Sequence, residues 1–69
     1  MSGVLIYVNG DERSVTAETT VEQVVGEVTA LSSGVAAAVN GVVVPRREWG
    51  AQLVRDGDRI EIVTAVQGG

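Results

Sequence analysis

Two Asn-Gly pairs, Asn9-Gly10 and Asn40-Gly41, constrain the fold of this chain more than any other feature of its sequence. Each pair follows a short apolar run that ends in valine. Asn-Gly supplies the positive φ angles of a two-residue hairpin turn, so each pair predicts two antiparallel strands. Pro45 has no N–H to donate and is expected to end the second hairpin. The four strands are expected at residues 4–8, about 12–16, 35–39 and 42–44, the third of them as a buried central strand.

The segment between the two predicted hairpins has the periodicity of a helix. Its apolar residues recur at the i, i+3, i+4, i+7 and i+10 positions of one helical face, and a capping box can begin at Thr19 or at Thr20. Gly26 and the β-branched valines lower the intrinsic helix propensity, so packing against a sheet has to stabilise this helix. Ser32-Ser33-Gly34 is expected to end it. The predicted apolar face consists of Val21, Val24, Val25, Val28 and Leu31.

The last third of the chain predicts a connection and one more strand. Residues 45–49 are read as a connection with one helical turn, and 55–58 as a turn. Ile60, Ile62 and Thr64 then alternate with Glu61 and Val63, as expected for a strand with one covered face. The order hairpin, helix, hairpin, connection, strand is α+β and matches the β-grasp, or ubiquitin-like, fold. We therefore expect one domain at 1–66, with a mixed sheet of about four to five strands and one main helix on one face, and a flexible tail at 67–69.

The composition excludes several classes of function. The chain has 69 residues, no cysteine and no histidine, and its five basic residues are all arginine. Thiolate metal sites, disulfides and the commonest catalytic bases and nucleophiles are therefore absent, and we expect no bound metal and no enzyme activity. A net charge of −4 disfavours nucleic acid and favours a basic partner surface. No apolar run approaches a membrane span and no signal peptide is apparent, so we expect a cytoplasmic protein.

The terminal pair Gly68-Gly69 is the strongest functional signal. Two glycines make a thin backbone thread that ends in a carboxylate and can enter a narrow active site of another protein. The four residues at 66–69 reach at most ~14 Å beyond the last strand. Activation of the carboxylate by ATP would give an acyl-adenylate, and sulfide would then convert it into a thiocarboxylate. The nucleotide site must lie on a partner, because this chain has neither a phosphate-binding loop motif nor lysine.

Several motifs together resemble those of the ThiS-type sulfur carriers of thiamine biosynthesis, and the resemblance covers essentially the whole chain. They are Val8-Asn9-Gly10, Thr20-Val21, Val39-Asn40-Gly41, Val44-Pro45-Arg46 with Trp49, Asp56-Gly57-Asp58, Ile60-Glu61-Ile62 and Gly68-Gly69. The family implies that an adenylyltransferase resembling ubiquitin-activating enzymes adenylates Gly69 with ATP. It further implies that a sulfur donor such as a cysteine desulfurase supplies the sulfur, and that thiazole synthase uses it to build the thiazole of thiamine. No cofactor would be bound by the carrier itself.

Site residues follow from the tail and from the last strand. Gly69 is expected to be the modified residue, and Gly68 to give the clearance that a side chain would block. Val63 points away from Ile60 and Ile62, so it is expected on an exposed apolar patch that binds a partner. Gln67 is polar where the family commonly has small or apolar residues, and its side chain is expected to influence how a partner fits.

Three further positions have two interpretations each. Trp49 is either an anchor in or beside the core or a partner contact, because tryptophan is common at binding hot spots. Arg46 either contacts an acidic partner group or is a solvated surface charge. Asp56-Gly57-Asp58 is interpreted mainly as a turn with positive φ at Gly57, rather than as a carboxylate pair for metal binding or acid–base chemistry.

Three other functions compete with sulfur delivery for thiazole synthesis. A carrier like the small subunit of molybdopterin synthase would share Asp-Gly-Asp and Gly-Gly, but that group is usually somewhat longer and is not associated with Pro-Arg-x-x-Trp. A ubiquitin-like binding module without covalent chemistry would keep its activity after loss of Gly68 and Gly69. A small enzyme is disfavoured by the missing nucleophiles and bases.

Overall fold

Both Asn-Gly pairs form hairpin turns, as predicted. The structure is a computed structural model that describes residues 3–31 and 33–65. Asn9 and Asn40 have positive φ angles of 51° and 53°, and the glycine after each is also in the positive-φ region, which fits the turn type that Asn-Gly favours. The turns join β1 (Gly3–Val8) to β2 (Asp11–Thr16) and β3 (Val35–Val39) to β4 (Val42–Val44).

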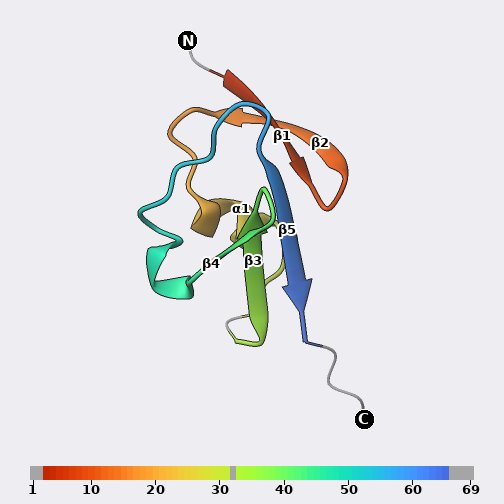
Figure 1. Ribbon diagram of the computed structural model, residues 1–69, viewed down its shortest axis with the longest axis vertical. Helices are drawn as coiled ribbons and strands as arrows, with labels where there is room; N and C mark the ends of the chain where they lie inside the picture. Colours follow the sequence, from red (N-terminus) through yellow and green to blue (C-terminus); the bar gives the residue numbers. More distant parts are fainter. Residues whose placement is uncertain (1–2, 32, 66–69) are drawn as a thin grey trace.

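The last strand, β5 (Arg59–Thr64), lies in the middle of the sheet. The strand order is β2-β1-β5-β3-β4, with β5 parallel to β1 and antiparallel to β3 (Figure 1). The sheet is therefore mixed, with five strands, and one helix lies against it, which confirms the predicted α+β architecture. β3 is an interior strand, as expected, although the central position belongs to β5. The predicted boundary between residues 66 and 67 lies outside the described residues.

The helix α1 (Val21–Val28) begins at the second of the two possible capping boxes. The Thr20 hydroxyl accepts a hydrogen bond from the Gln23 backbone N–H at 3.2 Å, and the Thr20 N–H donates to the Gln23 side chain at 2.9 Å. The N–H groups of Val21 and Glu22 donate to carbonyl oxygens of the connection that follows β4. The backbone donors of the first helical turn are thus satisfied, and the helix is joined to the connection.

The helix ends earlier than the periodicity predicts. Thr29 is extended, with φ −146° and ψ 148°, and its hydroxyl accepts a hydrogen bond from the Leu31 N–H at 3.1 Å. This local side-chain hydrogen bond competes with helical pairing. Leu31 is consequently not part of the helical face, and 55% of its surface is exposed. The prediction that Leu31 packs with the valines of α1 is wrong.

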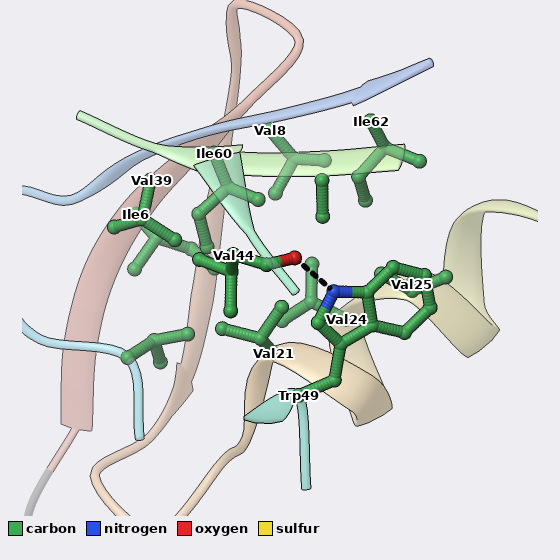
Figure 2. Close-up of a cluster of buried hydrophobic side chains, with 12 residues drawn as sticks. Ile6, Val8, Val21, Val24, Val25, Val39, Val44, Trp49, Ile60 and Ile62 are labelled. Carbon is green, nitrogen blue, oxygen red and sulfur yellow. Dashed lines mark hydrogen bonds between the residues drawn. The ribbon is translucent and has the colours of Figure 1, made fainter. Parts of the chain in front are cut away.

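The core lies between α1 and the face of the sheet that the helix covers (Figure 2). The connection contributes a 3₁₀ turn, η1 (Arg46–Glu48), which confirms the single helical turn expected there. Trp49 follows this turn, and its indole N–H donates to the Val44 carbonyl oxygen at 2.8 Å. The buried hydrophobic residues are Ile6, Val8, Val21, Val24, Val25, Ala37, Val39, Val44, Trp49, Val54, Ile60 and Ile62.

Candidate binding site at the C-terminal strand

The central strand β5 presents different side chains to the two faces of the sheet. Ile60 and Ile62 point into the core and are 1% and 6% exposed. Val63 follows the buried Ile62 in sequence but points to the opposite face, where 63% of its surface is exposed. The period of two along a strand explains this difference. The prediction that Val63 is exposed is confirmed, and its contact with a partner stays a prediction.

Small and branched apolar side chains surround Val63 on the face without a helix, which we call the open face. The register places Ala36 of β3 directly opposite Val63, and Ala38 opposite both Glu61 of β5 and Val43 of β4. Residues that face each other across paired strands point to the same side of a sheet. Val43 is 69% exposed and Ala36 is also exposed. We define these four apolar residues, Ala36, Ala38, Val43 and Val63, as the open-face patch.

The end of β5 is fixed to the start of β3. Thr64 pairs with Val35, and the Ala65 N–H donates to the Gly34 carbonyl oxygen at 2.6 Å. Gly34 has a φ of 70°, a conformation that side-chain-bearing residues seldom adopt. The chain therefore leaves the sheet from a defined point next to the open-face patch. The predicted site residues Gln67, Gly68 and Gly69 follow this point and lie outside the described residues.

The Asp-Gly-Asp segment forms the turn that precedes β5. Gly57 has a φ of 87°, and the carboxylates of both its neighbours accept hydrogen bonds from backbone N–H groups. Asp56 accepts a hydrogen bond from the Leu5 N–H at 2.8 Å. Asp58 is buried and accepts from the Arg55 N–H at 2.9 Å and from the Asn40 side-chain amide at 3.0 Å. These contacts confirm the interpretation as a turn and show that both carboxylates have structural partners.

Trp49 and Arg46 lie on the helix side of the sheet, away from Val63. Trp49 is 5% exposed, and its burial favours the role of core anchor over that of a partner contact. The Arg46 guanidinium carbon is 5.4 Å from the centre of the indole ring, within the range of a cation–π contact. Both residues border a shallow groove together with Val25 and Leu31. Among the predicted interface residues that the structure describes, Val63 therefore lies on one surface, and Arg46 and Trp49 lie on another.

Across residues 3–31 and 33–65, no group of three or more His, Cys, Asp or Glu side chains is arranged to hold a metal ion. Within the same ranges, no helix has the length and apolar character needed to cross a membrane.

The sequence analysis did not predict that Ala36, Ala38 and Val43 belong to the open-face patch, because strand pairing alone brings them beside Val63. The feature of the sequence that could have indicated part of this patch is the run of three alanines at 36–38.

Comparisons with known proteins agree on one family. A family model described as the ThiS family matches residues 6–69. The sulfur carrier protein ThiS of Escherichia coli is 31% identical over 64 residues, which cover 93% of this chain and 97% of that protein. A protein named thiazole synthase from Paramagnetospirillum magneticum is 39% identical over 64 residues, and the chain spans 20% of its length. The crystal structure of thiamine biosynthesis protein ThiS from Geobacter metallireducens matches with a TM-score of 0.77 and 28% identity, over 96% of this chain and 100% of that one.

Proposed function

The chain belongs to the ThiS family of sulfur carriers of thiamine biosynthesis, and from this premise we propose that Gly69 is the residue that carries the sulfur. In the proposed reaction, an oxygen of the Gly69 carboxylate attacks the α-phosphate of ATP, pyrophosphate leaves, and an acyl-adenylate forms. Sulfide, released from a persulfide on the sulfur donor by a thiol reductant, then attacks the carbonyl carbon, AMP leaves, and a thiocarboxylate remains. The chain supplies the acyl group, and partner enzymes supply the catalysis.

The observation that carries this proposal is the extent of the family match. It runs through residue 69 and so includes both terminal glycines. The composition supports the same reading, because the chain has no cysteine on which it could hold sulfur in another way. Gly68 is proposed to keep the thread narrow enough to enter a partner, since a side chain at this position would widen it.

Three partners belong to the proposal. They are an adenylyltransferase resembling ubiquitin-activating enzymes, a sulfur donor such as a cysteine desulfurase, and thiazole synthase as the receiver. The similarity of this chain to one fifth of a protein named thiazole synthase supports the last of these, because a carrier domain in the same polypeptide implies that the two act together. A cytoplasmic location, where such partners and ATP are available, completes the proposal.

The open-face patch is proposed as the surface on which a partner rests while it takes the tail. Val63 belongs to the same strand that continues into the tail, so an enzyme that binds the terminal glycines must approach this end of β5. Glu61 lies next to the patch, and the net charge is −4, which favours a partner surface with an apolar centre and basic groups around it. Arg46 and Gln67 are proposed as additional contacts outside the patch.

Deletion of Gly69 tests the site directly. The purified chain is incubated with the activating enzyme, ATP and a sulfur donor, and its intact mass is measured. We expect the wild type to gain the mass difference of one oxygen exchanged for sulfur, and the variant without Gly69 to show no such species. Loading of the truncated chain at the wild-type rate would refute the assignment of Gly69.

Two controls make the deletion informative. Circular dichroism and thermal unfolding should be unchanged by the deletion, because Gly69 follows the last strand, which ends at Thr64.

Genetic complementation distinguishes the thiazole pathway from the molybdopterin pathway. A strain that requires thiazole should be rescued by this gene, whereas a strain that lacks the small subunit of molybdopterin synthase should not. The reverse pattern would favour the molybdopterin pathway.

A further inference from the structure

The two Asn-Gly turns bind β5 at different places. The Asn9 side-chain amide donates to the Ile62 carbonyl oxygen at 3.2 Å and accepts from the Ile62 N–H at 2.9 Å. The Asn40 side-chain oxygen accepts from the Arg59 N–H at 2.9 Å. Asn9 therefore contacts the half of β5 that leads to the tail, whereas Asn40 contacts the first residue of the strand.

The contacts of Asn9 continue the pairing of β1 with β5 after β1 has ended. The Tyr7 N–H donates to the Asp58 carbonyl oxygen, and the Asn9 N–H donates to the Ile60 carbonyl oxygen, both at 2.9 Å. The next carbonyl in this series belongs to Ile62, and the chain has by then turned away towards β2. The Asn9 side-chain amide has the same donor and acceptor as a peptide group, and it binds Ile62 in place of the missing strand residue.

This arrangement holds the second half of β5 from both sides. On one side, Val63 and Thr64 pair with Ala36 and Val35 of β3. On the other side, the pairing with β1 covers Arg59 and Ile60, and the Asn9 side chain extends the hydrogen bonding to Ile62. Without that side chain, β5 beyond Ile60 would be hydrogen-bonded to β3 alone. A strand held at one edge has more freedom to bend and fray than one held at two.

We propose that Asn9 is a positioning residue, whose side-chain amide fixes the C-terminal half of β5 and so sets the direction in which the segment bearing Gly69 leaves the sheet. This inference rests on the proposed function, because direction matters only if a partner takes the tail. If the tail leaves the sheet in one direction, a larger fraction of the chains is in a conformation that the partner can bind. The conformational entropy that is lost on binding is then smaller.

Glycine substitutions separate this role from that of a turn residue. Glycine adopts a φ near 51° without strain, so Asn9→Gly keeps the turn and removes only the amide. Asn40→Gly is the matched control, since Asn40 occupies the same position of an equivalent turn with a φ of 53°. It also loses hydrogen bonds, to Arg59 and Asp58, but these lie at the beginning of β5.

The experiment measures ATP–pyrophosphate exchange by the activating enzyme at varied concentrations of wild type, Asn9→Gly and Asn40→Gly. We expect Asn9→Gly to raise KM for the carrier about tenfold with kcat within about twofold, because the two hydrogen bonds that hold Ile62 in β5 are lost. Asn40→Gly should change KM by less than about twofold, since its contacts lie at the beginning of β5. Amide hydrogen exchange on the isolated chains should speed up at Ile62 in the first variant and at Arg59 in the second.

The outcomes are distinguishable. An equal KM for the two variants would overturn the positioning role while leaving the proposed function intact. An unchanged rate of amide hydrogen exchange at Ile62 in Asn9→Gly would do the same. If the wild type supports no ATP–pyrophosphate exchange by its activating enzyme, the proposed function is overturned, and the positioning role with it. If Asn9→Gly does not fold, the Asn9→Asp variant tests the positioning role in its place. The carboxylate keeps an acceptor for the Ile62 N–H but has no donor for the Ile62 carbonyl, so KM should still rise several-fold.

Discussion

The two faces of the sheet differ although the same strands build both. On the covered face, Ile6, Ile60 and Ile62 are buried against α1, and Trp49 lies beside them with its indole N–H bonded (Figure 2). On the open face, the alternate residues of β3 and β5 are alanine, valine and charged side chains, and most of them are exposed. The buried positions of a strand such as β5 therefore stabilise the fold, and the proposed partner contact would involve the alternate positions. A substitution at one position should leave the other property almost unaffected.

The largest expected effect is on the covered face. Ile60→Ala removes a side chain that is 1% exposed, and should lower the free energy of unfolding by about 2–5 kcal/mol. In a domain of this size such a loss is a large part of the total stability. Denaturant unfolding followed by circular dichroism measures it. A loss below about 0.5 kcal/mol, the range of surface substitutions, would break the distinction between the faces.

An intermediate effect is expected at Trp49. Trp49→Phe keeps an aromatic ring in the core but removes the N–H that donates to Val44, and should cost about 1–3 kcal/mol in the free energy of unfolding. Loading should be unchanged at temperatures where the variant is folded, because Trp49 is buried on the covered face. The same unfolding experiment, with a loading assay alongside, checks both statements. A folded variant with impaired loading would instead indicate that Trp49 contacts a partner.

The smallest effect on stability is expected on the open face. Val63→Asp introduces a charge at a residue that is 63% exposed, and should change the free energy of unfolding by no more than about 0.5 kcal/mol. Its effect on function should be larger, because a charge within an apolar contact has to be desolvated on binding. The KM for the carrier in ATP–pyrophosphate exchange is expected to rise about tenfold or more, equivalent to about 1.4 kcal/mol.

Val43→Asp provides the matched control for that prediction. It places the same charge at the other end of the open-face patch, on β4 rather than on the strand that continues into the tail. A smaller rise in KM than for Val63→Asp would show that the partner contact is centred near the tail. Equal rises would extend the contact across the whole patch, and no rise in either variant would contradict the proposed role of the open face.

Local signals in the sequence were sufficient to predict most of the fold. Asn9-Gly10 and Asn40-Gly41 fix their turns by backbone geometry, and the alternation in β5 assigns Ile62 and Val63 to opposite faces before any pairing is known. The end of α1 could not be predicted in this way. The apolar periodicity continues to Leu31, and the hydrogen bond at Thr29 that competes with the helix has no periodic signature.

The parts of the site that depend on pairing were not predictable from one sequence. Ala36 and Ala38 become neighbours of Val63 and Glu61 only once β3 and β5 are aligned in register. The double hydrogen bond between Asn9 and Ile62 joins residues that are 53 positions apart. Sequence patterns within a window of a few residues contain no information about such a contact. The proposed role of the terminal glycines, in contrast, rests on their chemistry and on the family resemblance, and it stays a prediction.

The central place of the last strand has a consequence for how the domain folds. β5 is the shared neighbour of β1 and β3, so without it the sheet separates into two hairpins with no pairing between them (Figure 1). Isolated hairpins are marginally stable in water, and contacts between distant parts of a chain form slowly because a long loop must close first. Folding is therefore expected to be all-or-none and limited by the docking of β5. Chains interrupted before Arg59 would present two unprotected hairpins to cellular proteases instead of a smaller folded carrier.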